Sequence, residues 1–157
     1  MRINSAMKRQ LKGATFDQLL EPSLRAIADE GFEQRDGCHF LRALVALTRD
    51  ARSATFYDCT AYECFVNSVH VEDYDGKMPL MQAIQLAMRV LTIWNTSTPT
   101  LTLLAIISSD ELSVVVKFHV QRPTEQWLSE NIEGYDDPVM SIESTDDMAT
   151  VLAALPM

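Results

Sequence analysis

Apolar residues recur with a helical period in the first part of the chain and with a strand period after residue 100. A capping-box sequence at Thr15 precedes apolar residues at helical spacing, and Gly31 is expected to stop this helix. Because Pro22 lies inside it, we expect either a kink or two short helices. Further helices are expected over residues 40–47, where a strand is the alternative for so short a run, and over residues 58–70.

The clearest helix covers residues 79–94 and begins with a proline, which suits the first helical turn. Its polar positions form one narrow stripe, made of Gln82, Gln85, Arg89 and Thr92. Because the rest of its surface is apolar, we predict that it is the central helix of the core.

Strand patterns dominate the last third of the chain. Three strands are expected, at residues 101–107, 112–120 and 139–143, and a four-residue hairpin-type loop joins the first two. A short helix containing Trp127 and Leu128 is expected before the third strand, and a last helix follows from residue 148. We therefore predict a single α+β domain over residues 1–157, with N-terminal helices followed by a small sheet of about three or more strands, short helices and a C-terminal helix.

Composition is that of an ordinary globular protein, with 47% apolar and 22% charged residues. No apolar stretch reaches the ~18 uninterrupted residues of a membrane span, and the first residues lack the apolar region of a secretory signal. We therefore expect a cytoplasmic protein with no membrane contact. The three cysteines, Cys38, Cys59 and Cys64, are then expected to be reduced and buried, because no Cys-x-x-Cys pair marks a zinc site.

The net charge of −9 is concentrated at the end of the chain. Residues 1–52 carry nine Lys or Arg against seven Asp or Glu, whereas residues 123–157 carry eight acidic residues and no Lys or Arg. Such a field repels nucleic acid and anionic lipid and attracts basic partners. Solubility alone would also explain the acidity, so the charge excludes nucleic-acid binding better than it identifies a partner.

His119 is the first candidate for chemistry. It lies at the polar end of a predicted strand, with Glu125 close behind it, and a carboxylate that orients a histidine makes a general base. No serine or cysteine nucleophile stands in a recognised motif, so a structural role is favoured.

His70 is the second candidate, in an acidic turn with Glu72, Asp73 and Asp75. The cluster could bind a metal, but it lacks the full calcium-loop pattern. A polar turn between two helices explains these residues as well, because acids near a helix N-terminus are favoured. We predict no enzyme activity, cofactor or metal.

Trp127 has two interpretations, because acidic and polar residues surround it in the sequence. It either packs on the sheet beside Leu128 or serves as an exposed aromatic anchor at an interface. Trp94, at the end of the central helix, is expected in the core.

Residues 58–74 read DCTAYECFVNSVHVEDY, and residues 114–144 read VVVKFHVQRPTEQWLSENIEGYDDPVMSIES. Both stretches resemble small immunity proteins of bacterial contact-dependent growth inhibition systems. The order F-H-x-x-R, E-x-W-L and G-Y carries most of the resemblance, which covers more than half of the chain. In those systems an immunity protein binds and blocks the toxin domain of a large exported protein.

The resemblance implies that this chain neutralises a cognate toxin domain, and such toxins are frequently nucleases with basic substrate-binding surfaces. An acidic partner would block that surface without chemistry of its own. The expected contact residues are Glu125, Trp127, Glu130, Glu133, Tyr135, Asp136, Asp137, Glu72, Asp73 and Asp75. Two alternatives stay open: an acidic secretion chaperone or adaptor, and a small hydrolase that uses His119 or His70.

Overall fold

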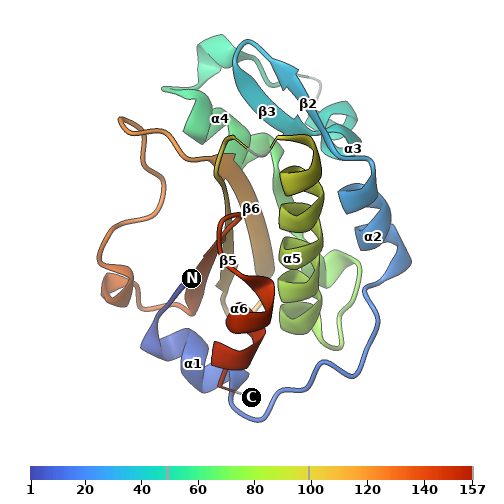
Figure 1. Ribbon diagram of the computed structural model, residues 1–157, viewed down its shortest axis with the longest axis vertical. Coiled ribbons are helices and arrows are strands. Elements are labelled where there is room, and N and C mark those ends of the chain that lie inside the picture. The colour runs from blue at the N-terminus through green and yellow to red at the C-terminus, as the bar shows by residue number, and fades with distance from the viewer. Residues whose placement is uncertain (49, 99, 157) are drawn as a thin grey trace.

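A five-stranded antiparallel sheet forms the centre of the molecule (Figure 1). The structure is a computed structural model that describes residues 1–48, 50–98 and 100–156. The strand order is β1 (Arg2–Ile3), β7 (Val139–Glu143), β5 (Leu103–Ser109), β6 (Val114–Val120) and β4 (Ser68–His70). The predicted α+β class is confirmed, and the three predicted strands correspond to β5, β6 and β7.

Helix α5 (Pro79–Ser97) packs along one face of the sheet and confirms the predicted central helix. Phe118 of β6 and Ile107 of β5 lie with Trp94 of the helix in one fully buried core, so the prediction for Trp94 is also confirmed. The polar stripe of α5 forms hydrogen bonds with the segment that precedes α2. Gln82, itself buried, accepts a hydrogen bond from the Glu21 amide and donates to the Leu19 carbonyl.

The N-terminal region contains two separate helices, α1 (Ser5–Leu11) and α2 (Pro22–Asp29). The prediction of a helix starting at Thr15 is wrong, because α2 begins only at Pro22. Proline fits there since it has no amide hydrogen to leave unsatisfied, and the Glu21 carboxylate caps the amides of Ser23 and Leu24. As expected, the helix stops before Gly31, whose φ of 70° favours glycine.

A second, two-stranded sheet lies beyond one end of the main sheet, formed by β2 (Phe32–Arg35) and β3 (Cys38–Leu41). The helix predicted over residues 40–47 is thus replaced by a strand end and the short helix α3 (Arg42–Val45). The turn is Asp36-Gly37, and both residues have positive φ, as a two-residue hairpin loop requires.

Helix α4 (Cys59–Val66) begins after Asp58, whose carboxylate accepts a hydrogen bond from the Ala61 amide. The helix predicted over residues 58–70 is therefore confirmed at its start, but its end is strand β4. The last helix, α6 (Met148–Ala154), is confirmed, with Asp147 as its cap.

The segment from residue 121 to 138, named the 121–138 segment below, crosses the face of the sheet opposite α5 (Figure 1, orange). The helix expected around Trp127 does not form there, and the segment has one helical turn at Ile132–Gly134. Leu128 and Ile132 pack onto Leu104 and Ile106 of β5, so an irregular backbone covers this face through a small apolar cluster of its own.

Cys38 of β3 and Cys59 of α4 form a disulfide, whereas Cys64 is a buried free thiol. The expectation of three reduced cysteines is therefore wrong for two of them, because the hairpin and the helix come together only in the fold. None of the helices within the described ranges is long and apolar enough to cross a membrane.

Candidate functional site

Two buried polar side chains, those of Glu63 in α4 and of Asn67 at the C-terminal cap of this helix, connect the hairpin to the main sheet. Glu63 accepts hydrogen bonds from the amides of His39 on β3 and Val120 on β6, both at 2.7 Å. One turn later Asn67 accepts from the Leu41 amide and donates to the carbonyls of His39 and Phe118. Residues four apart on a helix share one face, so these two side chains take the place of a missing strand between β3 and β6. We call this arrangement the polar seam.

Arg122, the first anchor of the 121–138 segment, neutralises the charge in the polar seam. Its guanidinium binds both oxygens of the fully buried Glu63 carboxylate at 2.7 and 3.0 Å. Burial works against the charged form of Arg122, but the hydrogen bonds and charge of Glu63 outweigh it, and the pKa of Arg122 is raised. The segment therefore starts from a fixed point.

Further contacts hold the rest of the segment. The Glu125 carboxylate accepts from the amide and hydroxyl of Thr60, in the first turn of α4. At the other end, Asn4 donates to the carbonyl of Asp137 at 2.8 Å, and the Ser5 amide donates to the Glu133 carboxylate. The 121–138 segment is thus pinned at both ends despite its irregular backbone.

A cavity of about 580 Å³, named the Trp127 pocket, lies between this segment and the sheet. Its apolar lining comes from Leu101, Leu104, Pro123, Trp127 and Leu128. Its polar and charged lining comes from Arg2, Thr100, Thr102, His119, Gln121, Arg122, Glu125, Gln126 and Glu130. Sequence reasoning picked out several of these residues, but it could not place Arg2 beside them, because β1 joins the sheet from the far end of the chain.

His119 lies in the floor of the Trp127 pocket with 4% of its surface exposed. Its Nδ1 lies 3.0 Å from the Val120 carbonyl, which can only accept, so Nδ1 carries the proton and Nε2 is an acceptor. Nε2 is buried and has no hydrogen-bond partner within the described residues. Burial lowers the pKa of His119, and the Val120 carbonyl and Glu63 offset this only in part.

The predicted pairing of His119 with Glu125 does not take the form of a hydrogen bond among the described residues. Glu125 instead binds Thr60 and lies 3.8 Å from Arg122. A neutral imidazole that donates to its own neighbouring carbonyl has a structural role or binds a ligand through Nε2, and nothing orients it as the base of a triad.

The acidic residues predicted to bind a partner divide into two groups. Four are engaged within the protein: Glu125 and Glu133 as described, Glu72 with the Val114 amide and His70, and Asp75 with the amides of Lys77 and Met78. The carboxylates of Asp73, Glu130, Asp136 and Asp137 make no hydrogen bond or ion pair within the described part of the chain, and all four residues are exposed. The second group is free to contact a partner.

The two aromatic residues predicted at the contact surface are partly exposed, Trp127 at 46% and Tyr135 at 38%. The ammonium of Lys117 lies 5.9 Å from the Trp127 ring centroid and 3.0 Å from the Ser68 hydroxyl. Burial lowers the pKa of Lys117. Trp127 therefore combines the two expected arrangements: one side lies over the sheet and the other faces outward.

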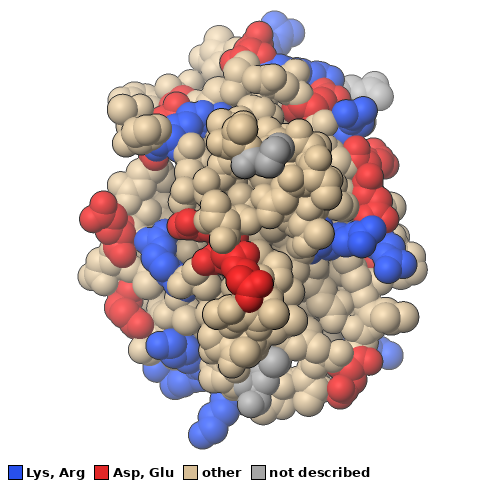
Figure 2. Space-filling model, in the orientation of Figure 1, with Lys and Arg blue, Asp and Glu red and all other residues tan. Residues whose placement is uncertain are grey.

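Charge on the face drawn in Figure 2 is mixed, with acidic and basic groups interspersed. Acidic groups stand along the left margin, where Figure 1 places the 121–138 segment. The excess of eight acids seen in the sequence therefore does not form one uniform patch on this face. Another group of acidic side chains stands near the centre of the same face, so the acidic surface is divided among separate places (Figure 2).

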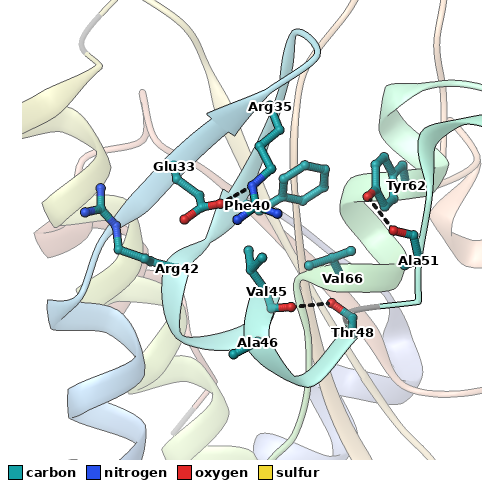
Figure 3. A pocket seen from close by; sticks show the side chains of 10 residues that line it. All are labelled: Glu33, Arg35, Phe40, Arg42, Val45, Ala46, Thr48, Ala51, Tyr62 and Val66. Carbon is teal, nitrogen blue, oxygen red and sulfur yellow. Dashed lines mark hydrogen bonds and ion pairs between the residues drawn. The ribbon is translucent and has the colours of Figure 1, made fainter.

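A second cavity, of about 380 Å³, opens between the β2–β3 hairpin, α3 and α4 (Figure 3). Its floor is apolar, from Phe40, Val45 and Val66, and an ion pair between Glu33 and Arg35 lies at its rim. Arg42 also lines the cavity and donates to the Phe32 carbonyl, so the charged lining among the described residues is two arginines against one glutamate.

The structure is a small α+β protein with an irregular, acidic 121–138 segment held at both ends, and comparison with known sequences gives its family. The chain matches the uncharacterized protein PM0498 family over residues 2–153 and belongs to that family. Neither a curated protein nor a solved structure matches the chain.

Proposed function

We propose that this chain is an immunity protein that binds and neutralises a cognate toxin domain of a bacterial contact-dependent growth inhibition system. The toxin is expected to be a nuclease with a basic substrate-binding surface. The chain would occupy that surface in place of the phosphate backbone and would perform no chemistry itself.

The observation that carries the proposal is the 121–138 segment. It presents the free carboxylates of Glu130, Asp136 and Asp137 beside the half-exposed rings of Trp127 and Tyr135. Aromatic anchors within a polar rim are typical of interface hot spots. Because the segment is pinned at both ends, little conformational entropy is lost when it binds.

The test is to coexpress the chain with the C-terminal domain encoded by the gene immediately upstream, then to measure cell growth and complex formation. We expect the wild-type chain to restore growth and to copurify with that domain. The double charge reversal Asp136→Lys/Asp137→Lys should weaken the complex at least tenfold and abolish protection. Because association relies on charge, the affinity should fall as salt is raised.

A matched control is the double variant Glu30→Lys/Asp50→Lys, which changes the net charge by the same amount. Both residues are exposed, Glu30 directly after α2 and Asp50 a few residues after α3, and these two helices lie on the side of the molecule away from the 121–138 segment (Figure 1). Equal losses for the two double variants would show that only net charge matters, and no complex at all would overturn the proposal.

The proposal places the chain in the cytoplasm, a compartment that reduces disulfides. Binding should therefore be measured with and without a thiol reductant. We expect protection to survive reduction, because the Cys38–Cys59 bond joins β3 to α4 and leaves the contacts of Asn4 and Arg122 with the 121–138 segment in place.

A further inference from the structure

We propose that a groove beside α5 is a binding site for a small amphiphile, an unbranched alkyl chain that ends in a carboxylate. The groove, named the α5–α6 groove, is a cavity of about 410 Å³ between α5, α6 and the chain that leads into α2 (Figure 1). It shares no residue with the 121–138 segment, so the proposal goes beyond the toxin complex and does not depend on it. Its lining consists of Phe16, Leu20, Arg25, Gln85, Met88, Arg89, Thr92, Met148 and Leu152.

The apolar part of the lining suits an alkyl chain. Its five apolar side chains are partly buried and pack against the main core, so a ligand would complete the burial that the fold leaves unfinished. Two of them, Met88 and Met148, have unbranched, flexible side chains that adapt to the shape of an apolar ligand. The lining follows α5 from Gln85 to Thr92, a distance of about 10 Å along the helix axis, which favours an extended chain.

The charged part of the lining is basic within the described residues, because it consists of Arg25 and Arg89. Arg89 is already neutralised, since its Nε and Nη2 atoms each lie 2.8 Å from Oδ1 of Asp29. The side chain of Arg25 is exposed and makes no hydrogen bond or ion pair within the described part of the chain. One guanidinium group therefore stands uncompensated at an apolar groove, which matches a ligand with a single negative charge.

The nearest acidic residues in the sequence do not contact Arg25. The Glu21 carboxylate caps the amides of Ser23 and Leu24, and the Asp147 carboxylate caps the Thr150 amide. A guanidinium group binds both oxygens of a carboxylate through parallel N–H donors, so Arg25 is the expected contact of the head group.

The two uncharged polar side chains of the lining do not oppose this arrangement. The Thr92 hydroxyl donates to the Met88 carbonyl at 2.8 Å, and Gln85 donates one amide hydrogen to the Gln18 carbonyl at 2.7 Å. Gln85 keeps a second N–H donor for a carboxylate beside Arg25. The groove thus offers an apolar floor, one free cation and one spare donor.

The first test varies the length of the alkyl chain. The intact protein is titrated with hexanoate, octanoate and decanoate below their micelle-forming concentrations, and the methionine methyl signals are followed by NMR. We expect saturable shifts at Met88 and Met148, with none at the fully buried Met140 of β7. Each added methylene should tighten binding by up to about fourfold until the groove is filled.

Two results of this series would overturn the proposal. Affinity that does not change with chain length would show that the apolar floor is not used. Affinity that stops rising at hexanoate would show that only a short aliphatic group fits, as expected for a side chain of a docked protein rather than an alkyl chain.

The second test varies the charge of the head group. Octanol has a similar tail without a charge, and octylammonium reverses the charge, so octanoate should bind about fivefold more tightly than octanol and octylammonium most weakly. Arg25→Gln should weaken octanoate binding about fivefold and leave octanol binding unchanged. Equal binding of octanoate and octanol by the wild-type protein would overturn the proposal.

Arg9→Gln is the matched control, because it removes the same charge from an exposed residue that does not line the groove. It should leave the binding of both probes unchanged. A loss of octanoate binding equal to that of Arg25→Gln would show that only the net charge of the protein matters, and would contradict a site at Arg25.

Vesicles of phosphatidylglycerol are the last probe, because a membrane surface also presents alkyl chains and negative charge. Binding to these vesicles without saturable binding of octanoate would assign the groove to a membrane surface and contradict a small-molecule site. Failure of the groove leaves the toxin complex testable through Asp136 and Asp137, so the two proposals stand or fall separately.

Discussion

Arg122→Met is the most informative single change, because Arg122 neutralises a carboxylate with no solvent exposure. The Glu63 side chain is 0% exposed, and that of Arg122 is 19% exposed. Removing one partner of a buried pair costs about 3–5 kcal/mol, because the other charge stays buried without compensation. Glu63 keeps the amides of His39 and Val120 as donors, so we expect the lower end, about 3 kcal/mol.

For a chain of this length, that loss corresponds to a fall in Tm of roughly 6–12 °C. Urea unfolding followed by the fluorescence of the fully buried Trp94 measures it, with the urea m-value as a check that the unfolded state is unchanged. Arg25→Met is the control, because Arg25 is exposed and its side chain makes no hydrogen bond or ion pair within the described residues. It should change the free energy of unfolding by less than about 0.5 kcal/mol.

A double-mutant cycle with Glu63→Gln tests the physical reason. Once the carboxylate is neutral, Arg122→Met should cost at least 1 kcal/mol less than it does alone, because no buried charge is left behind. The reasoning is refuted if Arg122→Met costs less than about 1 kcal/mol, or if the two changes simply add.

Two further predictions concern the cysteines and the histidines. Cys38→Ser/Cys59→Ser should lower the free energy of unfolding by about 3 kcal/mol, because the disulfide closes a loop across a separation of 21 residues. A reductant should lower the free energy of unfolding of the wild-type protein equally and leave that of the double variant unchanged. Burial lowers the pKa of both His39 and His119 below 6.5, so the unfolded chain binds more protons than the folded one as pH falls through that value. The free energy of unfolding should therefore fall from pH 7 to about pH 5, by up to about 1.4 kcal/mol per pH unit for each histidine. Urea titrations at several pH values measure this slope, and His119→Gln should make it smaller. An unchanged slope in that variant would contradict the prediction.

Periodicity predicted the parts of the fold whose cause is local. Helix α5 and strands β5, β6 and β7 have long, regular apolar patterns, and each appears within a few residues of its expected position. The errors occur where tertiary contacts decide. The region predicted as helix after Phe40 is a strand at its start, because Glu63 and Asn67 satisfy the outer edge of β3.

Local signals for some missed elements were present in the sequence. Asp36-Gly37 is a typical two-residue hairpin turn, and Pro22 directly after Glu21 is a typical helix start. The disulfide had no such signal, because Cys38 and Cys59 lie in elements that meet only in the fold. Most residues of the Trp127 pocket could be grouped from the sequence, because they lie between His119 and Glu130. Arg2 could not, because it reaches the pocket through the pairing of β1 with β7.

The acidity of the chain's end also takes a different meaning once the contacts are known. Five of the eight acids after residue 122 bind groups within the protein, namely Glu125, Glu133, Glu143, Asp146 and Asp147. These carboxylates accept hydrogen bonds at helix starts, at strands and at the N-terminus. They add to the negative electrostatic field of the protein, but contact with a partner would break these bonds and lower the free energy of unfolding. In the proposed toxin complex, the contact energy would come from Glu130, Asp136 and Asp137 with the aromatic rings beside them. Salt should therefore slow association strongly, because all eight charges steer a basic partner, whereas dissociation should respond mainly to changes at these few residues.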